Sequence, residues 1–204
     1  MSRLLAFTFL TLHTFLSIGQ NNQLMYENTE YQQIPSYEAE YSANTVVARM
    51  IDGLIYRLYW ATEELTPKDL EYRPEGEGTK TIDETMDHMH GLALTIRNTC
   101  LGQVNRRPMT TPDTSSFAEK RLVTFALLKQ ASETLKDGGI DAADLKIVFE
   151  RNGTQSEFPF WNLINGQISD AIYHTGQIVS YRRSSGNPID PMVNVFTGKN
   201  RGSN

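Results

Sequence analysis

Four segments of the chain carry apolar residues at every third or fourth position, the spacing that lines one face of an α-helix. This spacing predicts four helices that begin near residues 44, 81, 116 and 161, the first ending near 65 and the last near 183. A helix with one apolar face must bury that face, and several such helices pack most economically against one another. We therefore expect an all-α fold, a four-helix bundle with long loops between its helices.

Capping motifs mark the predicted helix ends. Thr81 with Glu84, and Ser116 with Glu119, each form a capping box, in which the hydroxyl and the carboxylate accept hydrogen bonds from backbone N–H groups of the first turn. Gly186 follows the last helix, and glycine is the residue type that most often ends one. These motifs support the helix boundaries that the apolar spacing predicts.

One stretch departs from the helical period. Residues 146–150 have the composition of a strand, and Asn152-Gly153 is a strong signal for a hairpin turn. Residues 157–160 can supply the returning strand. The sequence thus predicts a small β-hairpin directly before the last helix.

The first 20 residues are typical of a secretory signal peptide. Arg3 is followed by a mostly apolar stretch from Leu4 to Ile18, and small residues stand where a signal peptidase cleaves. The stretch is short for a membrane span, which needs about 20 apolar residues. We therefore expect cleavage near Gly19 or Gln20, export to the periplasm, and no stable membrane association afterwards. An uncleaved anchor is the alternative.

The rest of the chain has the length of one domain, since 204 residues less the targeting segment fall within the usual range. Residues 21–43 are polar with scattered tyrosines and follow no helical or strand period, so we expect a linker or a loosely packed arm. The helical domain is expected to cover residues 44–190, followed by a C-terminal tail over 191–204.

Net charge and cysteine content argue against several functional classes. The formal net charge of -5 argues against nucleic-acid binding, which requires clustered Lys and Arg. The single cysteine, Cys100, allows neither an intramolecular disulfide nor a Cys-x-x-Cys motif. Cys100 lies four residues after Ile96, so we expect it to pack within a helix face.

The predicted last helix carries a polar stripe beside its apolar face. The stripe consists of Gln167, Asp170, His174, Gln177 and Tyr181. Residues three or four apart share one side of a helix, and this side lacks the Lys and Glu typical of an exposed face. Asp170 and His174 are about one turn apart, so both side chains can converge on one metal ion. An ordinary Asp–His hydrogen bond is the simpler alternative.

A third metal ligand has to come from another helix. Besides His174, the chain after the predicted signal peptide holds only His88 and His90, which lie two apart and so point to opposite sides of their helix. The helical period does not choose between them, and either could be an ordinary histidine at the edge of the core. Glu84 lies one turn before His88 and is a candidate fourth ligand or outer hydrogen-bond acceptor.

Two segments resemble the DinB-like (damage-inducible B-like, also YfiT-like) family. Thr81-Ile82-Asp83-Glu84-Thr85-Met86-Asp87-His88 resembles the start of that family's second helix, and residues 165–178 with 182–188 resemble its last helix, with a His-x-Gly-Gln-Ile signature at His174. The resemblance covers roughly residues 44–190 and implies a four-helix bundle whose metal is held by three histidines. It implies His88, not His90, as a ligand. Where the family has another histidine this chain has Asp170, which implies a site of two histidines and one carboxylate.

The resemblance implies a metalloenzyme that binds zinc, nickel, iron or manganese. Three protein ligands leave positions for water or a small-molecule substrate. Characterised relatives include thiol-dependent transferases and isomerases, and hydrolysis is a competing reaction class. Gln177, Tyr181 and Glu84 are candidates to position substrate or move protons. Family members often pair, so the resemblance implies a homodimer.

Two alternatives to an enzyme are consistent with the same residues. In the first, the bundle is non-catalytic and Asp170 with His174 is a structural pair, a structural metal site or the vestige of one. In the second, the protein is a periplasmic interaction module that works through the tyrosine-rich segment over residues 21–43.

Overall fold

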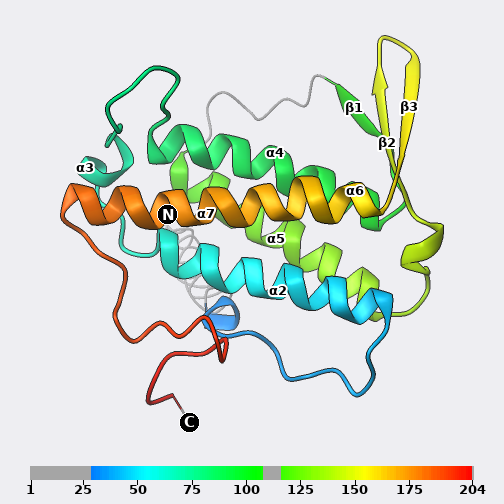
Figure 1. Ribbon diagram of the computed structural model, residues 1–204, viewed down its shortest axis with the longest axis horizontal. Helices are drawn as coiled ribbons and strands as arrows, with labels where there is room; N and C mark the ends of the chain where they lie inside the picture. The colour runs from blue at the N-terminus through cyan, green and yellow to red at the C-terminus, as the bar shows by residue number, and fades with distance from the viewer. Residues whose placement is uncertain (1–28, 108–115, 204) are drawn as a thin grey trace, which may run out of the picture.

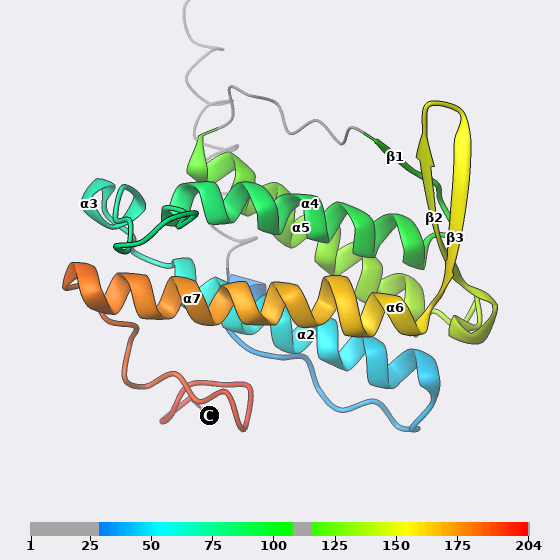
Figure 2. The same cartoon turned by 45° about the horizontal axis from the view of Figure 1, so that its top comes forward.

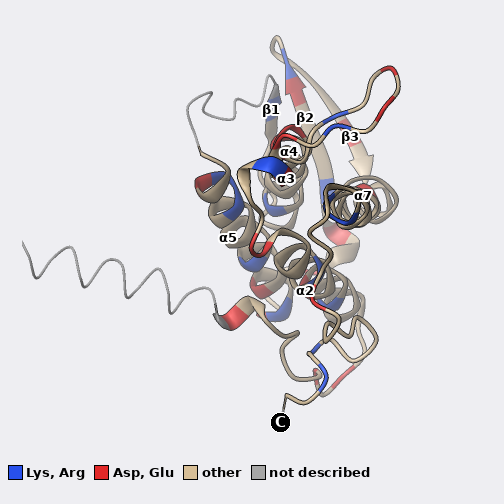
Figure 3. Cartoon of the chain, turned by 90° about the vertical axis from the view of Figure 1, so that its left-hand side faces the viewer, with Lys and Arg blue, Asp and Glu red and all other residues tan. Residues whose placement is uncertain are grey.

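Four long helices form the body of the protein in a computed structural model that describes residues 29–107 and 116–203. They are α2 (Ala43–Thr62), α4 (Ile82–Cys100), α5 (Phe117–Lys136) and α7 (Ser169–Ser185). Helices α2 and α4 each pack against both α5 and α7 (Figure 1). In the view along the helices, α2 lies opposite α4 and α5 opposite α7 (Figure 3). The predicted signal peptide lies outside the described residues.

The chain is mostly helical as expected, but the fold is not purely α-helical, because a small three-stranded sheet is present. The sheet holds β1 (Asn105–Arg107), β2 (Lys146–Arg151) and β3 (Thr154–Pro159), in that order. The remaining elements are short: η1 (Thr29–Tyr31), α3 (Pro67–Leu70), η2 (Ala142–Asp144), α6 (Trp161–Leu163) and the π-helical segment η3 (Ile164–Ile168).

The predicted hairpin is confirmed. Strands β2 and β3 pair antiparallel, with Lys146 opposite Pro159 and Arg151 opposite Thr154. The turn residues Asn152 and Gly153 both have positive φ, 52° and 77°, as a two-residue hairpin of this composition requires. Strand β1 was not predicted. It adds to β2 in parallel, and a strand of three residues is too short to show a period in the sequence.

Both predicted capping boxes are present. The Thr81 hydroxyl accepts from the backbone N–H of Glu84 at 3.1 Å, and the Glu84 carboxylate accepts from the N–H of Thr81 at 2.8 Å. Ser116 and Glu119 form the same pair at the start of α5. At the other end of the chain, Gly186 closes α7 in the left-handed conformation, φ 102°. The local chemistry therefore sets these boundaries, as expected.

The core lies between the four helices. The apolar stripe of α4 is fully buried: Ile82, Met86, Met89, Ala93, Ile96 and Cys100. In α7, Ala171 and Ile178 are buried, whereas Ile172 is 36% exposed. Of the other three long helices, α7 packs against α2 and α4, and Ile172 lines a hollow together with residues of the C-terminal tail.

The segments before α2 and after α7 lie against the helices. Tyr31 is buried, with its ring centroid 4.9 Å from that of Phe125, so this part of the expected arm is packed. The tail doubles back beneath α7 (Figures 1 and 2), where the buried Tyr56 hydroxyl donates to Asn200 and accepts from the N–H of Asn194. Within residues 29–107 and 116–203, no helix has the length and apolar content that crossing a membrane requires.

Candidate metal centre

Helices α4 and α7 lie side by side and bring three candidate ligands together (Figures 1 and 2). His88 lies in the second turn of α4, and Asp170 and His174 lie one turn apart at the start of α7. One nitrogen of each histidine and one oxygen of Asp170 all lie within 4.8 Å of one another. Two residues distant in sequence from His88 thus meet it across one helix interface.

Two contacts within this cluster, each to a different oxygen of Asp170, have the spacing of ligands that share one ion. His88 Nε2 is 3.1 Å from Asp170 Oδ2, and His174 Nε2 is 3.3 Å from Asp170 Oδ1. Ligands about 2.1 Å from a common ion in tetrahedral or octahedral geometry lie about 3.0–3.4 Å apart. The two imidazole rings are nearly perpendicular, at 86°, with centroids 4.7 Å apart. The donor set of two imidazoles and one carboxylate suits a first-row divalent metal.

Gln177 fixes the tautomer of His174. Its Oε1 lies 2.6 Å from His174 Nδ1, and since an amide oxygen only accepts, Nδ1 carries the proton and donates it. In neutral His174, the Nε2 lone pair then faces the Asp170 carboxylate at 3.3 Å. Two lone pairs facing each other repel unless a cation, either a proton or a metal ion, lies between them. Metal-binding histidines commonly use this arrangement, with the second nitrogen donating to an oxygen.

The cluster is open to solvent on one side. The side chains of His88 and Asp170 are 36% and 42% exposed, whereas that of His174 is 17% exposed. An ion held here would therefore have coordination positions accessible to water or to a small molecule.

A π-helical segment directly precedes the two ligands of α7. Over Ile164–Ile168 the backbone widens, and the Ser169 hydroxyl donates to the carbonyl of Ile164 at 2.7 Å. Single π turns of this kind occur often at functional sites, because they change which residues face a neighbour. Gln167 lies in this segment, and its buried Oε1 has no hydrogen-bond partner among the described residues. The sequence period did not reveal this segment.

Glu84 lies outside the ligand cluster. Its carboxylate accepts from Arg73 at 2.6 Å and from the backbone of Thr81. The hydrogen bond from the Thr81 backbone, followed by that from Arg73, lowers the pKa of Glu84 below its ordinary value. The carboxylate is therefore engaged in capping α4 and pairing with Arg73, and His88, Asp170 and His174 form the cluster without it.

Tyr181 also lies away from the ligands. It is two turns beyond His174, partly buried, and its ring lies 6.1 Å from that of Tyr72 between centroids. Of the candidates for positioning substrate, only Gln177 contacts a ligand of the cluster.

His90 lies on the other flank of α4. Its half-buried side chain has no hydrogen-bond partner for Nδ1 among the described residues. Burial lowers the pKa of His90, with a smaller opposing effect from Asp87 and a further lowering from Lys120. The helical period left His88 and His90 equal, and the structure places His88 in the cluster.

A buried polar network beyond the candidate site was missed from the sequence. Asp69 is only 1% exposed and accepts from the Ser185 hydroxyl and, at 2.8 Å, from Asn187. Burial raises the pKa of this carboxyl, but the hydrogen bonds from Ser185, Asn187 and Thr66 outweigh it and hold the pKa well below its usual range. The network ties α3 to the end of α7 and so fixes the helix that carries the ligands. Nothing in the spacing of these residues signals it.

Arg182, near the end of α7, is buried. It donates to the carbonyls of Trp60 and Ala61 at the end of α2, at 2.9 and 3.2 Å. Burial lowers its pKa, and nearby Asp69 partly opposes this effect. Arg182 therefore joins the C-terminal ends of two helices.

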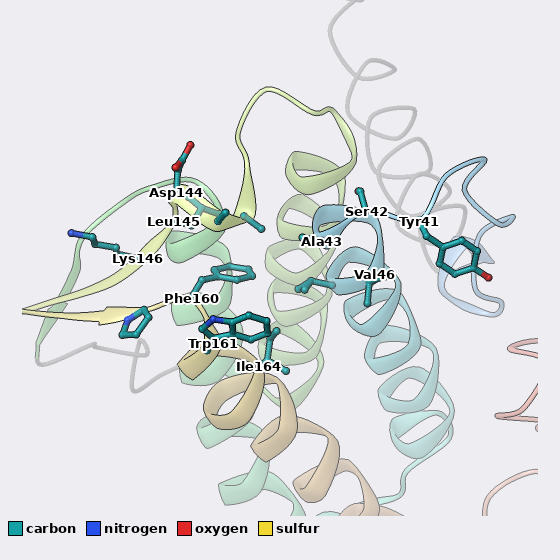
Figure 4. Close-up of a pocket in the computed structure, with 14 residues that line it drawn as sticks. Tyr41, Ser42, Ala43, Val46, Asp144, Leu145, Lys146, Phe160, Trp161 and Ile164 are labelled. Carbon is teal, nitrogen blue, oxygen red and sulfur yellow. The ribbon is translucent and has the colours of Figure 1, made fainter.

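A cavity of about 790 Å³ lies away from the cluster, between the start of α2 and the hairpin. Figure 4 shows Phe160, Trp161 and Ile164 on one side of it and Val46 on the other. Neither histidine of the cluster nor Asp170 lines it.

Comparisons of the chain with protein-family models, curated proteins and solved structures gave no match.

Proposed function

We propose that this protein is a metal-dependent enzyme that holds one divalent ion between His88, Asp170 and His174. The observation that carries the proposal is that two imidazole nitrogens and one carboxylate oxygen, from α4 and α7, lie within 4.8 Å of one another. The ion would be zinc, nickel, iron or manganese, which all accept imidazole and carboxylate ligands.

Support for an ion, rather than a plain hydrogen bond, comes from the lone pairs. The Gln177 contact directs the proton of His174 to Nδ1, away from Asp170. A bound cation would relieve the repulsion that this tautomer creates. Gln177 orients the imidazole, and the α7 backbone holds Asp170 one turn away.

Support for a reactive site, rather than a structural one, comes from the open side of the cluster. Structural sites are usually closed by a fourth protein ligand, and Glu84, the candidate one turn before His88, is paired with Arg73 and Thr81. When bound, a divalent ion lowers the pKa of a water molecule or of a thiol, or polarises a carbonyl. The reaction classes that follow are hydrolysis and thiol-dependent transfer.

The family and the location of the protein are part of the same proposal. The motif residues around His88 and His174 support membership of the DinB-like family, and the apolar segment after Arg3 supports export. Edman sequencing of the protein purified from the periplasm of expressing bacteria should begin near Gln20. Recovery of the intact N-terminus from the membrane fraction would contradict the proposed export.

Elemental analysis of the purified protein tests the metal site. We expect about one divalent ion per chain in the wild type and little in His88→Ala, Asp170→Ala and His174→Ala. His90→Ala is the matched control, because it removes a histidine of the same helix outside the cluster, and it should keep the metal. Stoichiometric metal in His174→Ala, with the fold confirmed by circular dichroism, would refute the site.

Activity is tested on the same set of proteins. Metal-loaded and chelator-treated samples are assayed with an ester, an amide and a thiol–electrophile pair. The proposal predicts a turnover that disappears with the metal and in His174→Ala but persists in His90→Ala. Full metal occupancy with no turnover in any assay would favour a structural or vestigial site.

A further inference from the structure

A second hollow lies on the side of α7 away from the candidate metal centre. It has a volume of about 390 Å³ and lies between α2, α7, the segment before α2 and the C-terminal tail. Its apolar lining includes Ile34, Tyr37, Ile172, Val195 and Phe196. Ile172 precedes His174 by two residues, and a helix turns about 100° per residue, so the two side chains point in nearly opposite directions.

Two arginines of α2 line the same hollow. Arg49 Nη1 donates to the carbonyl of Pro35 at 2.6 Å, and Arg57 Nη1 donates to that of Gly53 at 2.9 Å. In the described part of the chain neither forms an ion pair with a carboxylate, whereas Arg73 and Arg121 each pair with a glutamate. The sequence as a whole is acidic, with 24 acidic and 19 basic residues. Two guanidinium groups that lie on one surface without a paired carboxylate therefore form a local positive charge on an otherwise acidic protein.

Gly53 lies between the two arginines along α2 and lines the same hollow. The φ of Gly53 is not positive, so its backbone conformation does not require glycine. Glycine in the middle of a helix also makes the helix less stable than alanine would. A Cβ atom at this position would lie 3.0 Å from Arg57 Nη1 and 3.9 Å from Ile34 Cδ1. The absent side chain therefore makes the room in which the Arg57 guanidinium lies.

We propose that this hollow binds a small amphipathic carboxylate, with the carboxylate between Arg49 and Arg57. The apolar part of the ligand would cover Tyr37 and Phe196, whose side chains are 83% and 94% exposed. Guanidinium groups bind carboxylates through paired, charge-assisted hydrogen bonds. The Arg49 guanidinium lies 4.7 Å from the Tyr37 ring centroid, which holds it at the apolar surface. The volume lies within the usual range of small-molecule sites.

Isothermal titration calorimetry with decanoate tests the proposal, with decanol and sulfate as probes of each half of the ligand. We expect saturable binding of decanoate and much weaker binding of decanol and of sulfate. The double variant Arg49→Gln with Arg57→Gln should bind decanoate about tenfold less tightly or worse, since each charge-assisted contact is lost. The absence of saturable decanoate binding to the wild type, or equal binding of decanol, would overturn the proposal.

A second pair of variants keeps the test independent of the arginines. Ile172→Glu places a carboxylate in the hollow and should abolish decanoate binding. Val46→Glu is its matched control, because Val46 is a similarly exposed aliphatic residue that lines the cavity at the hairpin end. Loss of binding in Val46→Glu alone would assign decanoate to that cavity. Loss in His174→Ala would assign it to the metal centre, and either result overturns the proposal.

Discussion

Gln177 Oε1 accepts a hydrogen bond from His174 Nδ1 at 2.6 Å, from one turn further along α7. This contact directs the lone pair of His174 Nε2 toward Asp170. Loss of such an outer contact typically lowers metal affinity about 10- to 100-fold. We therefore expect Gln177→Leu to weaken metal binding by that factor, as measured by competition with a chromogenic chelator. Ser180→Ala, an exposed change on the same helix, is the control, and equal affinity in all three proteins would contradict the assigned role.

The Asp69 network predicts different costs for two adjacent serines. The Ser185 hydroxyl donates to the buried Asp69 carboxylate, whereas Ser184 is exposed. Ser185→Ala removes a donor from a buried charge and should lower the free energy of unfolding by about 1–3 kcal/mol. Ser184→Ala should change it by less than about 0.5 kcal/mol. Urea denaturation measures both, and equal effects would show that the network does not stabilise the fold.

The lowered pKa of His90 leads us to expect that the folded protein loses stability in mild acid. Burial lowers its pKa in the folded state, so the unfolded chain binds more protons once the pH falls below the ordinary value of about 6.5. Stability should therefore fall as the pH drops from about 6.5 toward the lower pKa of folded His90. In His90→Gln this part of the pH dependence should be absent. Urea midpoints between pH 7 and pH 5 provide the test, and identical slopes for the two proteins would contradict it.

The close contact between Gly198 and Ile34 holds the C-terminal tail against the segment before α2. The backbone of Gly198 has a positive φ of 72°. The N–H of Ile34 donates to the Gly198 carbonyl at 2.7 Å, so the two residues lie close together. A Cβ atom at position 198 would lie 2.5 Å from Ile34 Cδ1. Gly202 has a similar φ of 81°, but its nearest atom would be 3.9 Å away. Both alanine variants incur a backbone cost of about 1–2 kcal/mol, and only Gly198→Ala also displaces Ile34. We expect faster proteolysis of the tail in Gly198→Ala than in Gly202→Ala, and equal rates would refute the close contact.

Local chemistry explains which parts of the fold could be predicted. Thr81 and Ser116 begin helices because their capping partners lie three residues away, and Asn152-Gly153 forms its turn without outside help. Strand β1 depends on pairing with β2, some 40 residues later. Its three residues alone hold no such information.

Only the part of the candidate site that lies within one helix could be predicted from the sequence. Asp170 and His174 lie one turn apart, so the helix alone brings them together. The choice of His88 over His90 depends on the rotation of α4 against α7, which the helical period left open. The π segment and the Asp69 network, which position α7, arise from contacts between distant segments and carry no local signal.

The central claim is that His88, Asp170 and His174 hold one ion together. A crystal structure of the metal-loaded protein, with data collected at the absorption edge of the metal, tests this directly. We predict one anomalous peak within about 2.0–2.3 Å of His88 Nε2, His174 Nε2 and an oxygen of Asp170. An ion bound elsewhere, or a direct His–Asp–His contact with no anomalous peak after metal loading, would contradict the account.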